Sequence, residues 1–512
     1  MDHFFIIYML IASIDFISAF DFNSINLPRD HLKYYFNTFT KIGEDCLNDE
    51  SCRFKKEVGK TGCWGYENDC KEDKAYSKPS CSGDHKGWVK NKKDQINTFY
   101  TQADFGYIRE HEKEMSVMCE PLFKEDSSLE CSKYLRFCRG RNIMINFTDL
   151  ADRKEPLRYK MDVLKDGQIG GYCTFYEDRL KDECTHISPL QSWGPEMRYF
   201  KRLDKRPIVS GDCDIVVEKP TFIMKIDATV NMYHHFCDFF NLYMSQHLNL
   251  SQPDGFSTDV HILILESFTY FSHFASTFEA FTEHPIWDLK TFKGKTVCFR
   301  NVVFPLLPRM IFGLYYNTPI IWGCEKSGVF HAFSKHILHR LKIPEKKRKT
   351  TRIRITLLSR NTDYRNILNE NELIDALESE IVYFKKQLEV VRNTDLFIGI
   401  RGAGLTHLLF LPDWAVVFEL YNCEDENCYL DLARLRGIKY ITWQDKSKLE
   451  QQDEGKHPDG GAHAKFTNYK FDVDEFMRLI SNAEEYITSH KKFKKLLKKL
   501  ENMKKNSNHD EL

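Results

Sequence analysis

The sequence lacks an excess of charge of either sign, because 73 Lys and Arg residues balance 74 Asp and Glu residues. This balance argues against a nucleic-acid binder that relies on bulk electrostatic attraction. Beyond the N-terminus, no segment offers about 18 uninterrupted apolar residues, so we expect no membrane span there. Hydrophobic residues make up 42% and charged residues 29% of the chain, which is typical of a globular protein.

The 16 cysteines include no CxxC pair and have irregular spacings, which argues against zinc sites. Ten of them lie before residue 185, namely Cys46, Cys52, Cys63, Cys70, Cys81, Cys119, Cys131, Cys138, Cys173 and Cys184. In an oxidising compartment such a region is braced by disulfides. We therefore expect a disulfide-stapled region, with zinc binding as the alternative.

Both ends of the chain carry targeting features. Residues 1–19 combine an apolar run with small residues at Ser18 and Ala19, which predicts a secretory signal peptide; a membrane anchor is the alternative, although Asp15 interrupts the run. The last four residues, His509, Asp510, Glu511 and Leu512, form an HDEL signal for retrieval to the endoplasmic reticulum by a receptor. The sequons at Asn146 and Asn249 suit a lumenal protein.

The alternation of short apolar runs with helical stretches predicts two α/β units. Residues 20–204 form a Cys-rich accessory region. Residues 205–345 form a first unit with strands at 222–226, 260–265 and 297–299. The basic stretch at 346–352 is either a linker between the units or a solvated loop, and we expect the loop. In the second unit, 346–473, the expected strands are 354–358, 381–384, 396–400, 416–420 and 440–442, and the expected helices are 370–379 and 425–436. Such alternation implies parallel, doubly wound sheets and a cleft between the units.

Apolar residues recur at helical spacing over residues 474–505, which predicts a C-terminal helix. Residues 506–512 form the tail. The helix is rich in lysine, so it either docks on a domain by its apolar stripe or lies on a membrane surface.

The segment DLFIGIRGAG at 395–404 predicts a strand followed by a tight turn at Gly402, Ala403 and Gly404. In a doubly wound fold, ligands bind beyond the carboxyl ends of the strands, and glycines let backbone N–H groups approach a phosphate. Alternatively, the turn is purely structural.

Three further residues follow strands of the same unit. Arg360 and Arg365 come after the first strand and are either phosphate ligands or solvated cations. Glu419 ends a later strand and could bind a ribose hydroxyl.

The segment NMYHHFCD at 231–238 holds the acid–base candidates. In a helix, His234 and Asp238 lie one turn apart and could share a hydrogen bond, which would make a usable general base. Alternatively, Asn231 caps the helix and the histidines are satisfied within its face. Two or three ligands are too few to favour zinc here.

These segments resemble glycosyltransferase family 61, which includes a lumenal transferase acting on EGF-like domains, plant xylosyltransferases and an O-mannose-directed transferase. The resemblance covers nearly the whole mature chain. Its specific stretches are CWGYE at 63–67, FIMKID at 222–227, VNMYHHFCD at 230–238, LPRM at 307–310, YNTP at 316–319, GLTHLLFLP at 404–412, FELYNCED at 418–425 and KFTNY at 465–469.

The resemblance implies a GT-B-like architecture of two Rossmann-like lobes and an inverting transfer of N-acetylglucosamine from UDP-N-acetylglucosamine. It implies Ser or Thr acceptors in folded EGF-like domains of secreted and membrane proteins, such as Notch-type receptors. The second lobe would hold UDP near Arg360, Arg365 and the Gly402–Gly404 turn, without a metal being firmly implied. The family pattern Asn-x-x-His-x-x-x-Asp maps onto Asn231, His234 and Asp238 on the acceptor side.

The chain departs from the family pattern at three places. Relatives carry His where this chain has Arg401, which could still contact a donor phosphate but cannot reproduce a neutral imidazole; the segment 381–388 is also shorter than in relatives. Some relatives show an Asp-aromatic-Asp triplet where this chain has Glu283, His284 and Pro285, so we expect no metal ligation there. These departures keep open a non-catalytic alternative, a lumenal chaperone for EGF-like domains.

Overall fold

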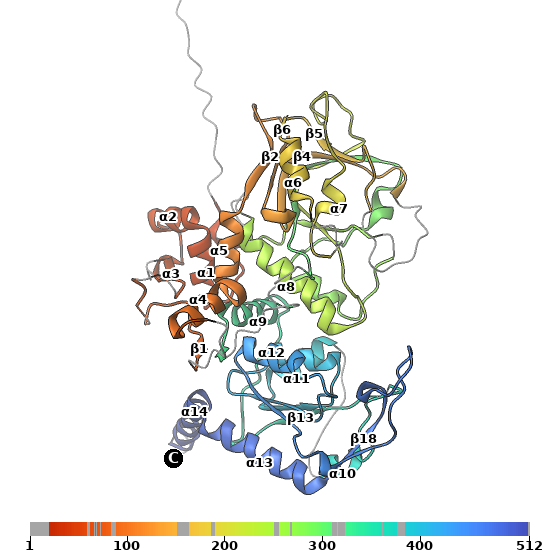
Figure 1. Ribbon diagram of the computed structural model, residues 1–512. Helices are drawn as coiled ribbons and strands as arrows, with labels where there is room; N and C mark the ends of the chain where they lie inside the picture. Colours follow the sequence, from red (N-terminus) through yellow and green to blue (C-terminus); the bar gives the residue numbers. More distant parts are fainter. Residues whose placement is uncertain are drawn as a thin grey trace, which may run out of the picture.

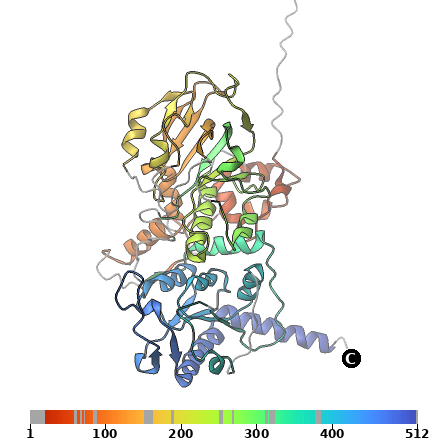
Figure 2. The same ribbon diagram turned by 90° about the vertical axis from the view of Figure 1, so that its right-hand side faces the viewer.

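The computed structural model describes residues 20–58, 62–65, 67, 69–71, 73–82, 89–150, 163–185, 190–249, 255–266, 269–309, 315, 323–360, 362–375 and 384–509. The predicted signal peptide at 1–19 and residues 510–512 of the retrieval signal lie outside these ranges, as does the YNTP stretch at 316–319. Figures 1 and 2 show two α/β units, with the blue second unit below the first in both views.

The first unit is built on a mixed ten-stranded sheet with the main order β10-β9-β11-β4-β3-β2-β6; β5 and β8 pair with β4 and β11, and β7 pairs with β5. Its strands are β2 Ser116–Glu120, β3 Ser128–Cys131, β4 Cys138–Asn146, β5 Ile169–Gly171, β6 Thr174–Phe175, β7 Phe200–Arg202, β8 Ile215–Val217, β9 Thr221–Met224, β10 His261–Ile264 and β11 Thr296–Phe304.

The pairing within this sheet separates its two parts. β9, β10 and β11 pair in parallel, as expected for an α/β unit, whereas β4 pairs antiparallel to β11. The purely parallel first sheet expected from the sequence is therefore wrong. The Cys-rich region supplies six of the ten strands, β2 to β7, and within it β2 pairs antiparallel with β3 and β6, and β4 pairs antiparallel with β3 and β5.

The helices of the N-terminal region are α1 Leu32–Thr38, α2 Thr40–Asn48, α3 Lys55–Val58, α4 Lys92–Ala103, α5 Phe105–Lys113, α6 Glu177–Glu183 and α7 Gly194–Met197. Among them α5 packs against α8, and α6 packs against β2. The long helices α8 Met232–Leu248 and α9 Gly328–Arg340 lie between the sheet and the second unit (Figure 1). Short 3-10 helices are η1 Phe22–Ser24, η2 Lys133–Leu135, η4 Ala275–Ala280, η5 Leu289–Phe292, η7 Lys446–Lys448 and η8 Ala464–Phe466.

The second unit contains a four-stranded parallel sheet in the order β13-β14-β15-β16. The strands are β13 Ile355–Leu358, β14 Leu396–Gly399, β15 Val416–Glu419 and β16 Lys439–Thr442. All residues of β14 and β15 are buried, as a parallel sheet covered on both faces requires. These strands confirm four of the five that the sequence predicts for this unit.

The helices of the second unit are α10 Glu370–Asp375, α11 Phe384–Arg392, the 3-10 helix η6 Ala403–Phe410 and α12 Asn427–Arg436. Gly437 ends α12 in the left-handed conformation, as predicted. The strand expected at 381–384 is wrong at Phe384, which begins α11; residues 381–383 lie outside the described residues. Phe384, Leu388 and Val391 recur at helical spacing, which explains the helix.

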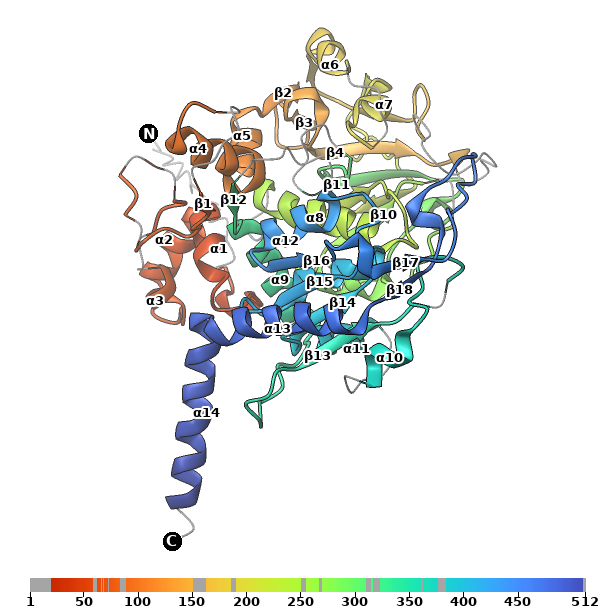
Figure 3. The same cartoon turned by 60° about the horizontal axis from the view of Figure 1, so that its bottom comes forward.

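The predicted C-terminal helix is two helices, α13 Val473–Ser489 and α14 Lys491–His509, separated at the extended residue His490. Phe476, Ile480 and Ile487 of α13 are buried against the second unit, whereas α14 projects from the body (Figure 3). Among the described residues no helix combines the length and apolar character that crossing a bilayer requires.

Six disulfides confirm the expected bracing: Cys46–Cys52, Cys63–Cys70, Cys81–Cys324, Cys119–Cys173, Cys131–Cys138 and Cys213–Cys298. Cys81–Cys324 joins the two-stranded sheet of β1 Ser80–Cys81 and β12 Cys324–Glu325. A further hairpin pairs β17 Leu449–Gln451 with β18 Tyr469–Phe471. The disulfides indicate folding in the oxidising secretory pathway.

Candidate active site

The glycine turn after β14 is occupied by side chains of this chain. A Cβ placed on Gly402 would lie 1.8 Å from Nη1 of Arg360, and a Cβ on Gly404 would lie 2.5 Å from Cδ2 of Leu358. Gly402 thus makes room for an arginine head, and Gly404 makes room for the end of β13. A cation, rather than open backbone, lies over the turn.

Arg360 and Arg365 converge on this turn as predicted. Their Nη1 atoms donate hydrogen bonds to the carbonyl oxygen of Arg401 at 3.4 and 3.5 Å. Neither guanidinium has an acidic partner within 4.0 Å among the described residues, and both Nε atoms lack an acceptor. Burial, followed by the charge of Arg365, lowers the pKa of Arg360. Two cations without an acidic partner at the carboxyl edge of a parallel sheet can attract an anion.

The backbone around this edge is strained. Arg365, Cys423 and Glu424 have φ values of +63°, +49° and +65°, in the left-handed region that residues with a Cβ rarely adopt. Such conformations cost about 1–3 kcal/mol each and occur preferentially at ligand sites. They lie beyond the ends of β13 and β15, on the same edge as the glycine turn.

Arg401, by contrast, has its charge neutralised within the fold. Its guanidinium pairs with Asp425 and lies 3.7 Å from Oε1 of Glu419, and its side chain is only 7% exposed. Glu419 is fully buried and accepts a 2.6 Å hydrogen bond from the hydroxyl of Tyr440. Burial raises the pKa of Glu419 to about 7. The structure gives Glu419 internal partners where the sequence suggested a ribose hydroxyl.

The first turn of α8 pairs its acids and histidines differently from the sequence-based expectation. Nδ1 of His234 lies 2.7 Å from Oδ2 of Asp227, and Oδ1 of Asp227 also pairs with Arg309 at 2.8 Å. Asp238 instead contacts His235, with 2.9 Å between Oδ2 and Nδ1. The expected hydrogen bond between His234 and Asp238 is wrong, because the i,i+3 neighbour His235 lies nearer.

The two pairs differ in exposure and charge. The His234 side chain is 23% exposed, whereas His235 and Asp238 are completely buried. Burial, together with the charge of Asp227, raises the pKa of Asp238, and burial lowers that of His235 to about 3. Burial thus favours the uncharged form of both groups.

The Asp227 carboxylate carries the negative charge of its pair with the partly exposed His234. Burial acts to raise the pKa of Asp227, but hydrogen bonds from His234 and Arg309 outweigh it and lower the pKa. An exposed imidazole backed by a charged carboxylate can accept a proton from a substrate.

Asn231 caps α8, because its side-chain oxygen accepts a 3.1 Å hydrogen bond from the N–H of Tyr233. This bond matches the capping role weighed from the sequence. Asp227 and Arg309 were not predicted as site residues, although their position beyond β9 and β11, at strand ends, is a signal that could have found them.

Ring contacts join the two halves of the candidate site. The Tyr233 ring of α8 meets the Tyr429 ring of α12 at 5.8 Å, and the Arg401 guanidinium lies 5.5 Å from the centre of the same Tyr429 ring. The helix after the glycine turn, η6, also packs against α8 and α9. The first turn of α8 and the glycine turn therefore face each other across the junction of the two units.

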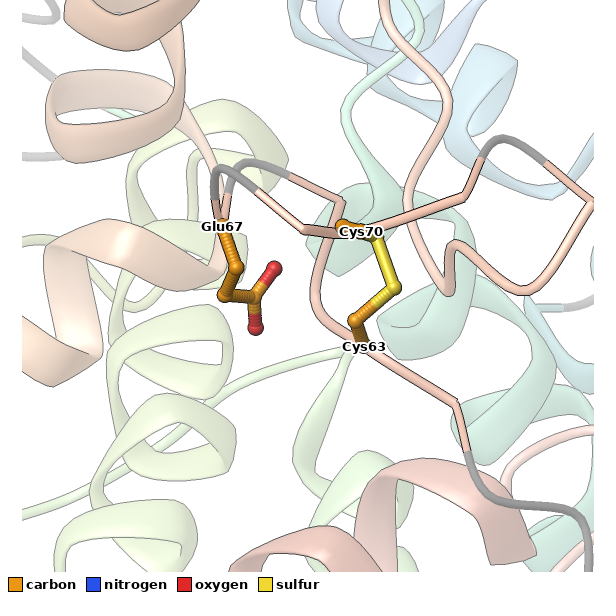
Figure 4. A group of neighbouring side chains, drawn as sticks. All are labelled: Cys63, Glu67 and Cys70. Atoms are coloured by element: carbon orange, nitrogen blue, oxygen red, sulfur yellow. A yellow bond between two sulfur atoms is a disulfide. The ribbon is translucent and has the colours of Figure 1, made fainter.

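Two groups of three metal-ligating residue types occur among the described residues. In the first, Cys63 and Cys70 form a disulfide and Glu67 accepts the N–H groups of Trp64 and Gly65 (Figure 4), so no thiolate is available there. The second joins Asp259, Glu283 and His284.

In this second group, His284 Nε2 lies 2.6 Å from Asp259 Oδ1, which the Lys219 ammonium also contacts. The Lys219 ammonium already supplies a positive charge beside this carboxylate. Pro285 follows directly in the chain and offers no ligand atom.

The two sequons differ in accessibility. Asn146 is partly exposed and its Oδ1 accepts hydrogen bonds from the N–H and hydroxyl of Thr148. Asn249 is fully buried at the C-terminal end of α8, so the folded chain offers no room for a glycan there.

Comparison with known proteins places this geometry in a family. Residues 214–418 match the family model Glycosyltransferase 61. The chain is 54% identical over 484 residues to the EGF domain-specific O-linked N-acetylglucosamine transferase of Drosophila melanogaster, covering 92% of both chains. The chain belongs to the family of EGF domain-specific O-linked N-acetylglucosamine transferases.

Vertebrate members of these transferases match at similar length. The chain is 47% identical over 511 residues to the transferase of Rattus norvegicus, covering 97% of this chain and 94% of that one. It is 49% identical over 499 residues to the transferase of Gallus gallus, covering 93% and 92%. The family match at 214–418 contains the His234–Asp227 pair, the arginines 360 and 365 and the glycine turn.

Proposed function

We propose that this chain is an inverting glycosyltransferase that moves N-acetylglucosamine from UDP-N-acetylglucosamine to Ser or Thr hydroxyls of folded EGF-like domains in the endoplasmic reticulum. The observation that carries this proposal is the identity of about half of the residues to transferases so named, over more than nine-tenths of both chains. The disulfides and the HDEL terminus support the compartment.

The two α/β units act as the lobes of a GT-B-like enzyme in this proposal. Donor diphosphate binds at the carboxyl edge of β13, β14 and β15. The unpaired guanidinium groups of Arg360 and Arg365 support this placement, as does the strained backbone of Arg365. Both cations would also stabilise the negative charge that gathers on the leaving UDP.

His234 is the general base in this proposal. Inversion needs one base to take the hydroxyl proton as the acceptor oxygen attacks the anomeric carbon. The exposed imidazole of His234 can reach a substrate, whereas the Asp238 carboxyl is buried against His235. Asp227 and Arg309 hold the His234 ring in one orientation, so both are positioning residues.

A non-catalytic chaperone for EGF-like domains is the second candidate. The observation that favours it is the position of Arg401, where the family resemblance implies a histidine; its guanidinium pairs with Asp425 and lies beside Glu419. In that case the chain would bind folded EGF-like domains without releasing UDP.

UDP release from UDP-N-acetylglucosamine in the presence of a folded EGF-like domain tests the proposal. We expect release with the wild type and its loss in Arg360→Ala/Arg365→Ala, while the control Arg352→Ala, an exposed arginine of the same unit, stays active. Binding of the EGF-like domain without any UDP release by the wild type would instead establish the chaperone.

A further inference from the structure

A cavity of about 530 Å³ lies at the amino-terminal edge of the parallel sheet, at the opposite end of the strands from the glycine turn. Arg354 and Trp414 line it; Arg354 immediately precedes β13, and Trp414 lies two residues before β15. Its other walls come from α9, residues 345–348 and α14. The cavity is large enough for a small-molecule ligand and is separate from the proposed donor site.

The lining of this cavity is strongly basic. Eight lysine or arginine residues line it against two acids, Glu345 and Asp413. Arg348 pairs with Asp395, Arg392 with Glu345, Arg436 with Asp413, and Lys346 with Glu389.

Three lysines of the lining remain unpaired. Lys335, Lys347 and Lys499 have no acidic partner within 4.0 Å in the described part of the chain. Nε of Arg348, whose side chain is 4% exposed, also lacks an acceptor. Positive charge therefore remains available for a ligand.

The floor of the cavity is apolar. Leu338 of α9, Leu411 and Trp414 before β15, and Leu496 and Leu500 of α14 supply it. A simple inorganic anion would leave these surfaces facing water, whereas a ligand with an apolar portion would cover them. The combination of a cationic mouth and an apolar floor selects a ligand that has both kinds of surface.

We propose that this cavity binds an anionic amphiphile, with a phosphate or carboxylate head at Lys335, Lys347 and Lys499 and an alkyl tail on the leucine floor. Lys335 belongs to α9 of the first unit and Lys499 to α14, so the ligand would bridge these two elements at the amino-terminal edge of the parallel sheet, opposite the glycine turn. The proposal is independent of the transferase activity.

Calorimetry with dodecyl phosphate below its micelle concentration tests the site, with inorganic phosphate and dodecylphosphocholine as the head-only and zwitterionic probes. We expect dodecyl phosphate to bind about 100-fold more tightly than inorganic phosphate, because the methylene groups leave water. The zwitterion should bind more weakly than dodecyl phosphate, because it carries no net charge.

Two adjacent lysines of α14 give the matched variants. Lys499→Ser should weaken dodecyl phosphate binding about fivefold, while Lys498→Ser, which is exposed and outside the cavity, should leave it within about twofold. The triple variant Lys335→Ser/Lys347→Ser/Lys499→Ser should weaken it about 50-fold. All three substituted lysines lie at the surface or rim, so the thermal unfolding temperatures should stay equal.

Equal effects of Lys499→Ser and Lys498→Ser would overturn the proposal, as would equal affinity for dodecyl phosphate and dodecylphosphocholine. If inorganic phosphate binds as tightly as dodecyl phosphate, the cavity is a simple anion site, and the proposed contact between the alkyl tail and the leucine floor is refuted. Tighter binding of an acidic peptide such as hexaglutamate than of dodecyl phosphate would assign the surface to a protein partner instead.

Discussion

Replacing Asp227 and Asp238 by asparagine, each in turn, separates the two buried acids of the α8 region. The pKa of Asp227 is lowered and its carboxylate contacts His234, whereas burial raises the pKa of Asp238 and favours its neutral form beside His235. Asp227→Asn therefore removes a charge, and Asp238→Asn replaces one neutral group by another of the same shape. We expect a large loss of turnover from the first change and a small one from the second.

The size of the loss follows from the contacts. A hydrogen bond to a charged group contributes about 1.5–3 kcal/mol, so losing the 2.7 Å bond between Asp227 and His234 should lower kcat about 10- to 150-fold. His234→Ala removes the base itself and should lower kcat about 10²- to 10⁴-fold. Because Asp227 acts through His234, the double variant Asp227→Asn/His234→Ala should be no slower than His234→Ala.

The assay is UDP release at saturating donor with a folded EGF-like domain, together with calorimetry of UDP binding. UDP affinity should not change in any of these variants, because Arg360 and Arg365 lie in the other unit. A hundredfold loss in Asp238→Asn with near-normal turnover of His234→Ala would refute the assignment and move the base to Asp238. Multiplied losses in the double variant would show that Asp227 acts independently of His234.

Deleting residues 509–512 should send the folded protein into the medium with transferase activity intact, and retention in cells would contradict the retrieval signal. The Cys81–Cys324 disulfide closes a loop of 243 residues, and replacing both cysteines by alanine should lower the free energy of unfolding by about 5.5 kcal/mol. The Cys46–Cys52 disulfide closes a loop of 6 residues, and its removal should cost about 2.2 kcal/mol. Urea unfolding of the two double-alanine variants measures both losses. Burial lowers the pKa of His407 to about 4, below its value of about 6.5 in the unfolded chain. As the pH falls from about 6.5 to about 4, the contribution of His407 to the free energy of unfolding should therefore fall by about 1.4 kcal/mol per pH unit. The variant His407→Gln should lose this part of the pH dependence. Gly404→Val should destabilise the second unit by its clash with Leu358 as well as weaken UDP binding, which thermal unfolding with and without UDP would reveal.

The sequence predicts the second unit well because its strands are short and apolar, and because the helices between them have apolar residues at helical spacing. β13, β14, β15 and β16 lie where the pattern places them, and Gly437 ends α12 as expected. The first sheet could not be predicted in the same way, because β4 pairs with β11, which follows about 150 residues later in the chain, and no local pattern encodes such a pairing.

The candidate site was predicted in part for the same physical reason. Strand ends converge, so the meeting of Arg360 and Arg365 at the glycine turn could be expected. Spacing alone could not decide whether His234 or His235 would face Asp238, since i,i+3 and i,i+4 neighbours share a helix face. Nor could it show that Arg401 would contact the buried Glu419 and the partly exposed Asp425, because those contacts depend on side-chain packing.

The bond between Cys81 and Cys324 has a consequence for the order of events during biosynthesis. Cys81 must wait for 243 further residues before its partner exists, which at a synthesis rate of about 5–20 residues per second takes roughly 12–50 s. Cys46 and Cys52 can join almost as soon as they reach the oxidising compartment. During that interval a wrong partner can capture the Cys81 thiol, so an isomerase that reshuffles mispaired bonds should raise the yield of the folded chain.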